Sequence, residues 1–127
     1  MKKLVECVPN ISEGNDQSVI NKIVQTVKKY PGIKLLNVDP GKATNRTVIT
    51  FVGDADIIVD AAFKLISKAK ELIDMRKHFG EHPRMGAVDV CPLIPISGIS
   101  MDETVDLAHK LSERVGNELL IPVYCYE

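Results

Sequence analysis

The sequence contains no tryptophan and few aromatic residues, which make up 5% of its 127 positions. Neither sign of charge is in excess, because 16 basic and 17 acidic residues leave a formal net charge of −1. A balanced charge offers no basic surface for nucleic acid or for an anionic membrane, so neither is expected as a partner. Long apolar runs are also missing, and Glu6 interrupts the N-terminal residues before a signal peptide can form. We therefore expect a cytoplasmic protein.

Cysteine is scarce as well. Cys7, Cys91 and Cys125 are widely spaced, and each lies within an apolar run. Structural zinc sites normally use close pairs of cysteines, which this sequence lacks. An odd number of cysteines in apolar surroundings predicts reduced thiols that pack in the core.

The length and the 45% hydrophobic content suit one globular domain over residues 1–127. Apolar residues recur at helical spacing after Asp16, after Asp54 and after Ser100, which has the spacing of a capping box with Glu103. These patterns predict helices over residues 16–30, about 54–78 and 100–115, with Gly116 beyond the last helix. Strands are predicted over residues 3–12, 33–38, 46–52, 86–96 and 119–126.

The order β-α-β-β-α-β, followed by an extra α-β unit, predicts an α+β fold of the ferredoxin-like (split βαβ) type. Its mixed sheet would have helices on one face only. The strand at residues 46–52 presents two alternating rows, neither of them polar: Val48, Thr50 and Val52 on one side, and Thr47, Ile49 and Phe51 on the other. A sheet with two apolar faces requires a cover on its second face. We expect a partner sheet, supplied in the simplest case by a second copy in a symmetric dimer.

The segment GEHPRMGAVDV at residues 80–90 has the features of a functional turn. Pro83 removes a backbone donor and biases His82 away from helical dihedral angles. Histidine titrates near neutral pH, which suits it to proton transfer in either direction. His82 is therefore either a catalytic residue or a turn residue with no further role, and the segment alone leaves both interpretations open.

Asp39, Arg46, His82 and Arg84 lie at the ends of predicted strands or in the turns beside them, where side chains converge on one edge of a sheet. A carboxylate such as Asp39 would orient His82 and stabilise its protonated form. The alternative for Asp39 is a structural residue of an Asp-Pro-Gly turn. Arg46 is either a solvated charge at a strand end or a binding group for an anion.

Two further patterns predict no site. His78 and His82 stand four residues apart, as zinc ligands on a helix do, but Gly80 and Pro83 end the helix before His82. We therefore expect no metal. The segment Gly-Lys-Ala-Thr at residues 41–44 lacks the spacing of a phosphate loop and precedes a strand, so nucleotide hydrolysis is not expected.

Three segments together resemble one family: VPNISEG at residues 8–14, NRTVITFVG at residues 45–53 and HPRMGAVDVCP at residues 82–92. They are similar to the N-terminal subdomain of glutamate formiminotransferase, the folate-dependent enzyme of histidine breakdown that is often fused to a cyclodeaminase. The resemblance covers essentially the whole chain. It implies transfer of a formimino group from N-formiminoglutamate to N5 of tetrahydrofolate, while related members use N-formylglutamate or 5-formyltetrahydrofolate.

By this resemblance, His82 is the catalytic acid/base, and Asp39 is assigned to orient its ring. Arg46, Arg84 and Asn10 are assigned to substrate binding, since a guanidinium group matches a glutamate carboxylate with two hydrogen bonds. Tetrahydrofolate is the implied co-substrate, and no metal is implied.

The resemblance also implies that a second subdomain is needed to complete the transferase unit. In the family, the transferase unit has two similar subdomains whose sheets face each other, and the second contributes a glycine-rich loop that binds folate. This chain resembles only the first subdomain. We therefore expect it to be a piece of a longer enzyme, one half of a split enzyme that pairs with a C-terminal subdomain chain, or a small homologue that pairs with itself. The competing interpretation is a non-catalytic subunit of a split enzyme, which binds folate or glutamate or serves in assembly.

Overall fold

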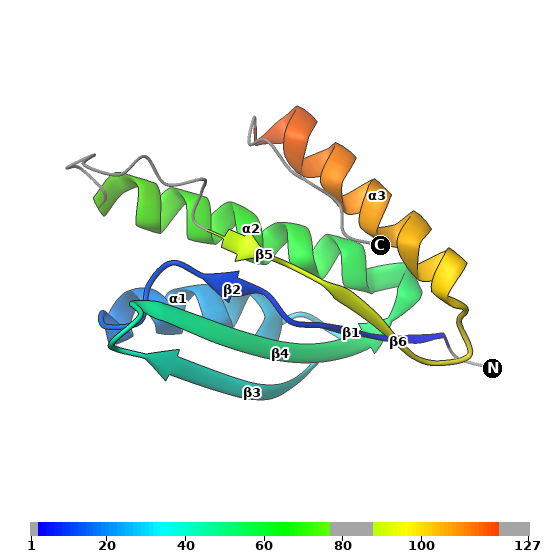
Figure 1. Cartoon of the computed structure of the whole chain (residues 1–127), viewed down its shortest axis with the longest axis horizontal. Coiled ribbons are helices and arrows are strands. Elements are labelled where there is room, and N and C mark those ends of the chain that lie inside the picture. The colour runs from blue at the N-terminus through cyan, green and yellow to red at the C-terminus, as the bar shows by residue number, and fades with distance from the viewer. Residues whose placement is uncertain (1–2, 77–87, 120–127) are drawn as a thin grey trace.

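The computed structural model describes residues 3–76 and 88–119 of the chain. The described strands form one sheet, and the described helices pack beside it (Figure 1). In chain order the elements are β1 (Leu4–Cys7), β2 (Asn10–Ile11), α1 (Gln17–Lys28), β3 (Lys34–Gly41), β4 (Arg46–Asp54), α2 (Ala55–Arg76), β5 (Val88–Val90), β6 (Leu93–Ser97) and α3 (Met101–Glu118).

The strand β4 is the centre of the sheet. One edge of β4 pairs with β1 and β2 and the other edge pairs with β3, while β6 and β5 pair with the outer edges of β1 and β2. β1 and β2 thus act as one strand interrupted at Val8 and Pro9, and β5 and β6 as one strand interrupted at Cys91 and Pro92. A 3.1 Å hydrogen bond from the Val8 N–H to the Pro92 carbonyl joins the two interruptions.

This arrangement confirms the α+β, ferredoxin-like prediction. With the interrupted strands counted as single ones, the order across the sheet is fourth, first, third, second, and the helices lie on one face. Every pairing between the described strands is antiparallel, so the described part of the sheet contains none of the parallel pairs of a mixed sheet. The predicted final strand over residues 119–126 lies outside the described residues, apart from Leu119, which caps α3.

Several element boundaries differ from the predictions. The predicted strands over residues 3–12 and 86–96 are each divided, because Pro9 and Pro92 have no N–H to continue the ladder. The strand predicted over residues 33–38 extends to Gly41, where it is still paired with β4, so the connection to β4 is only residues 42–45. Gly116, predicted to lie beyond the last helix, is inside α3, where glycine costs about 1 kcal/mol relative to alanine.

The helix starts agree with the sequence signals. The Asp16 carboxylate accepts hydrogen bonds from the backbone N–H groups of Ser18 and Val19 at 3.0 and 3.2 Å and caps α1. At the start of α3, Ser100 and Glu103 form the predicted capping box, with reciprocal side chain to backbone bonds of 3.1 and 3.0 Å. Because both signals are local in sequence, the sequence alone defines these two helix starts.

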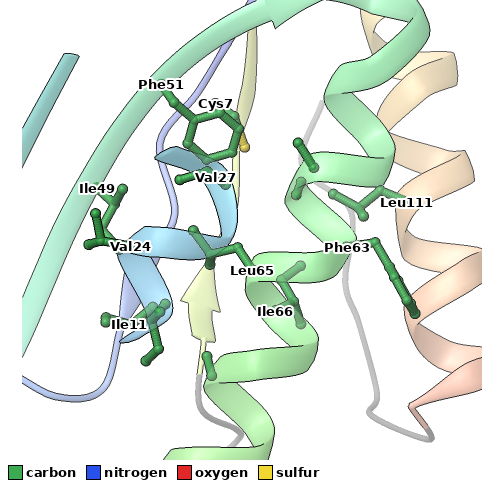
Figure 2. Close-up of a cluster of buried hydrophobic side chains, with 14 of the residues drawn as sticks. Cys7, Ile11, Val24, Val27, Ile49, Phe51, Phe63, Leu65, Ile66 and Leu111 are labelled. Atoms are coloured by element: carbon green, nitrogen blue, oxygen red, sulfur yellow. The ribbon is translucent and has the colours of Figure 1, made fainter. Parts of the chain in front are cut away.

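The core lies between the sheet and the helices. On β4, Thr47, Ile49 and Phe51 are fully buried, and Figure 2 shows Ile49 and Phe51 beside Val24 and Val27 of α1. Further buried side chains come from α2 and α3, among them Phe63, Leu65, Ile66 and Leu111. One of the two predicted rows of β4 is therefore the row that faces the helices.

The other row of β4 points to the opposite face of the sheet, which we call the open face. Val48, Thr50 and Val52 lie on this face and are half-buried. Ile94 of β6 shares it, because Ile94 and Val52 both pair with Glu6. Ile94 and its neighbour Ile96 are 39% and 52% exposed, so large apolar side chains remain in contact with solvent on this strand.

A polar network ties the three described helices together on the helical side. Tyr30, just after α1, donates a 2.6 Å hydrogen bond from its hydroxyl to Asp60 of α2. Arg114 of α3 donates a 2.7 Å hydrogen bond to the other oxygen of the same carboxylate. The Arg114 guanidinium also lies 3.8 Å from the centre of the Phe63 ring. Asp60 is therefore the common partner of side chains from two other segments.

We expect Asp60→Asn to lower the free energy of unfolding by about 1–3 kcal/mol, because it weakens two charge-assisted hydrogen bonds at once. The matched control is Glu71→Gln, which removes an exposed carboxylate whose ion pair with Lys68 is 3.6 Å long. That change should cost less than about 0.5 kcal/mol. Urea denaturation of both variants at neutral pH measures the difference, and equal losses would show that the network adds nothing beyond an exposed pair.

The Asp60→Asn variant also tests how the free energy of unfolding depends on pH. Hydrogen bonds from Tyr30 and then from Arg114 lower the pKa of the Asp60 carboxyl in the folded protein. A carboxyl with a lowered folded pKa stabilises the fold above its unfolded pKa, about 3.9, and loses that contribution as the pH falls through the folded pKa. The acid decline in unfolding free energy should therefore be shallower in Asp60→Asn than in the wild type below about pH 5. Parallel declines would contradict this assignment.

Candidate functional site

An open hollow of about 560 Å³ lies on the open face, at the end of the sheet where the β3–β4 hairpin turns. Three of the residues that line it, Asn10, Asp39 and Arg46, are candidates selected from the sequence. The described structure therefore brings together three of the five predicted site residues, although they come from separate strands. The remaining lining residues are Gly41, Thr44 and Val48.

Strand register explains this convergence. Val48 of β4 pairs with Asp39 of β3 on one side and with Asn10 of β2 on the other. Directly paired residues in an antiparallel sheet project to the same face, so the three side chains form one row across three strands. Arg46 lies two residues before Val48 on β4 and thus shares this face. A carboxylate, an amide and a guanidinium are thereby fixed to a rigid sheet.

The loop at residues 12–16 docks onto the turn of the hairpin beside the hollow. The Asn45 side-chain oxygen accepts hydrogen bonds from the Gly14 N–H at 2.9 Å and from the Asn15 side-chain amide at 2.8 Å. The Thr47 hydroxyl donates a hydrogen bond to the Glu13 carbonyl from the helical side of β4. The loop therefore contacts the hairpin at Asn45 and at Thr47, the residues directly before and after Arg46.

Two backbone positions in this contact require particular residues. Asn45 has φ 55°, in the left-handed region that asparagine tolerates better than most side chains. Gly14 lies so close to the hairpin that an added Cβ would be 2.3 Å from the Gly41 carbonyl oxygen and 2.6 Å from the Arg46 nitrogen. Any other residue at position 14 would push the loop away from the hairpin.

Asn10 contributes a buried polar atom. Its side-chain oxygen Oδ1 is inaccessible to solvent and has no hydrogen-bond partner in the part of the chain that the structure describes. An unsatisfied buried acceptor costs about 1–3 kcal/mol, so it requires a physical explanation. Asn10 as a residue also lines the hollow, although this oxygen itself is shielded from it.

The other two predicted site residues, His82 and Arg84, lie outside the described residues. In sequence they precede Val88 of β5, which pairs with Ile11 of β2, directly after Asn10. Thr44, Gly41 and Val48 line the hollow but are not candidates from the sequence analysis. The signal for Val48 was available, since it is two residues from Arg46 on the same side of a predicted strand.

Within residues 3–76 and 88–119, no three side chains among His, Cys, Asp and Glu lie close enough together to hold a metal ion. None of the helices in these ranges has the length and apolar character needed to span a membrane.

Comparison with known proteins identifies the family to which the chain belongs. The sequence model of the formiminotransferase domain, N-terminal subdomain, matches residues 4–127. The chain belongs to the formiminotransferase family. It is 56% identical over 126 residues to the formimidoyltransferase-cyclodeaminase of Rattus norvegicus, which covers 99% of this chain and 23% of the relative.

Two microbial relatives are each 50% identical to the chain. Identity to the glutamate formimidoyltransferase of Streptococcus pyogenes serotype M1 is 50% over 127 residues, covering 100% of this chain and 42% of the relative. For the Thermoplasma acidophilum glutamate formimidoyltransferase it is 50% over 123 residues, covering 97% and 41%. The chain thus spans less than half the length of each of these relatives.

The fold shows what two of the three segments that resemble the family do in the structure. Residues 8–14 contain β2 and the start of the docking loop, and residues 45–53 begin at Asn45 and continue along β4. The two segments contact each other through Gly14 and Asn45. They also supply Asn10 and Arg46 to the same hollow. Both segments therefore build one site in this chain.

We expect Gly14→Ala to lower the free energy of unfolding by about 1–3 kcal/mol, because the added methyl group overlaps the backbone of the hairpin. The matched control is Gly116→Ala inside α3, which should be neutral or stabilising by up to about 1 kcal/mol. Thermal and urea unfolding of both variants measure the changes. A Gly14→Ala protein as stable as the wild type would show that the loop and hairpin do not require this close approach.

Proposed function

We propose that this chain acts in the transfer of a formimino or formyl group between glutamate and N5 of tetrahydrofolate, together with a second subdomain or chain. The observation that supports the proposal is the convergence of Asn10, Asp39 and Arg46 in one hollow on the open face. The names of the relatives, glutamate formimidoyltransferase among them, support glutamate as one substrate.

His82 is the proposed acid/base. When a formimino carbon passes from one nitrogen to another, the incoming nitrogen must lose a proton and the departing glutamate nitrogen must gain one. A single imidazole with a pKa near neutrality can accept the first proton and return it to the second nitrogen. Asp39 is proposed to hold the ring in the required orientation and to stabilise its protonated form.

Arg46 and Arg84 are the proposed binding groups for the glutamate carboxylates, since a planar guanidinium pairs with a carboxylate through two parallel hydrogen bonds. Arg46 is supported by its place in the lining of the hollow, two residues from Val48 on the open face. Asn10 is proposed to contribute to substrate binding from the lining of the hollow. Tetrahydrofolate is the proposed co-substrate.

A second sheet is the proposed cover of the open face. The half-buried row Val48, Thr50 and Val52 has no helix above it among the described elements, and Ile94 beside it is 39% exposed. At about 25 cal/mol per Å², several hundred Å² of apolar surface left in water forfeits several kcal/mol. In the complete enzyme the cover would be the C-terminal subdomain, and without it a second copy of this chain.

A chimaera tests the proposed reaction. In it, this chain replaces the matching residues of the Streptococcus pyogenes relative, of which it spans 42%. We expect the chimaera to transfer a formimino group from formiminoglutamate to tetrahydrofolate, and His82→Ala to lower kcat by about 10²- to 10⁴-fold. Arg46→Ala should mainly raise KM for formiminoglutamate, by about tenfold or more, because it removes a binding contact.

The matched control is His109→Ala, which removes an exposed histidine of α3 on the helical side and should leave both kinetic constants unchanged. An active chimaera that tolerates His82→Ala would refute the acid/base assignment. A folded chimaera that binds glutamate or folate without turnover would instead favour the non-catalytic subunit.

The proposed cover is tested on the isolated chain. We expect light scattering across a dilution series to show a dimer at micromolar concentration, and Val52→Lys to convert it to a monomer by placing a charge in the apolar row. The control Glu113→Lys changes an exposed residue of α3 and should leave the dimer intact. A wild-type chain that is monomeric throughout would contradict pairing between two copies.

A further inference from the structure

The structure brings two thiols into contact that the sequence keeps far apart. The sulfur atoms of Cys7 and Cys91 lie 3.4 Å from each other, and both cysteines are free. Cys7 is on β1 and is fully buried, next to Phe51 on the helix-facing side of the sheet (Figure 2). Cys91 lies between β5 and β6 and is half-buried. The sequence predicts core thiols at both positions but gives no reason to pair them.

Backbone pairing between β1 and β6 determines the distance between the two sulfur atoms. Cys7 pairs directly with Leu93 of β6, and the Val8 N–H donates a 3.1 Å hydrogen bond to the Pro92 carbonyl. These two backbone contacts fix the segment around Cys91 against the end of β1. Because the ladder stops at Pro92, Cys91 lies where the fourth strand is interrupted, and its thiol meets the Cys7 thiol there.

A disulfide requires only a small further approach. The bonded distance between two sulfur atoms is about 2.05 Å, so the gap must close by roughly 1.4 Å. The two thiols also differ in exposure, since Cys7 is fully buried and Cys91 is half-buried. Burial raises the pKa of the Cys7 thiol well above its usual value, and the contact with Cys91 raises it further. The half-buried Cys91 is accordingly the thiol that a reagent in solution meets first.

We propose that Cys7 and Cys91 form a dithiol/disulfide pair that hydrogen peroxide oxidises and that a dithiol reductant restores. In the first step the Cys91 sulfur attacks one peroxide oxygen, the O–O bond breaks, and water leaves with the thiol proton, which gives a sulfenic acid on Cys91. In the second step the Cys7 sulfur attacks the Cys91 sulfur, the S–O bond breaks, and a second water leaves with the Cys7 proton. The two thiols lose two electrons in total, and one peroxide is reduced to two waters.

The bond would join β1 to the link between β5 and β6 and close a loop between residues 84 positions apart in sequence. A cross-link over a loop of this length is expected to raise the thermal midpoint by about 5–10 °C, because it removes conformational freedom from the unfolded chain. Neither cysteine lines the hollow that contains Asn10 and Arg46. The inference therefore does not depend on the proposed transfer reaction.

The test uses the purified chain with Cys125→Ser, so that the cysteine outside the described residues cannot take part. After treatment with hydrogen peroxide under native conditions, we expect a mass loss of about 2 Da, reversed by dithiothreitol, with proteolytic fragments joined between Cys7 and Cys91. Cys7→Ala in this background should leave the Cys91 sulfenic acid open to trapping by dimedone. Cys91→Ala should leave Cys7 unmodified, because it is buried.

Circular dichroism of each variant before oxidation confirms that the fold is retained, and mapping of the fragments in the Cys125→Ser chain alone suffices if a variant fails to fold. Three results would overturn the proposal. These are two unmodified thiols in the folded chain, stable oxidation of Cys91 alone to a sulfinic acid, or a disulfide that forms only in denaturant.

Discussion

The alternation of side chains along β4 is the constraint on which the rest of this structure depends. Thr47, Ile49 and Phe51 are fully buried beneath the helices, so the residues between them must face the other way. Arg46 and Val48 are therefore on the open face, where the hollow is. A shift of β4 by one residue would bury Arg46 in the apolar core and expose Phe51. The packing of the core thereby determines which side chains are available for binding.

The docking of the 12–16 loop onto the hairpin adds the second constraint. The β3–β4 hairpin ends in a turn over residues 42–45, and a turn at the end of a sheet is normally among its more mobile parts. Here the turn is held by the two hydrogen bonds that Asn45 accepts and by the close approach of Gly14. Arg46, the next residue, is consequently held at the rim of the hollow. The loop stabilises the site although its own side chains do not line it.

The sequence predicts those parts of the fold that local signals determine. Asp16 and Ser100 mark helix starts through bonds to residues two or three positions away, and the two rows of β4 follow from a period of two. Pairing between distant strands overrides local preference elsewhere. An Asp-Pro-Gly sequence is typical of a turn, yet Pro40 pairs with Thr47 and the strand continues to Gly41. Gly116, which the sequence suggests as a helix terminator, lies inside α3.

The residues of the site also divide into those that local sequence signals predict and those that strand pairing determines. Asn10, Asp39 and Arg46 were candidates from the sequence, and the structure places them in one hollow. Gly41 was not, because its place in the lining depends on the register between β3 and β4, which pairs it with Arg46. The contact between Cys7 and Cys91 depends in the same way on the pairing of β1 with β6. His82 and Arg84 lie outside the described residues, so their roles rest on the sequence and on the proposal.

The central proposal is that glutamate, as a substrate, binds in the hollow on the open face. A titration of the isotopically labelled chain with formiminoglutamate, followed by amide chemical shifts, tests it most directly. The account predicts that, in the described part of the chain, the largest changes occur at residues 10, 39, 41, 44, 46 and 48. Changes confined to the groove between α2 and α3, around Asp56, Glu103 and Leu107, would contradict it.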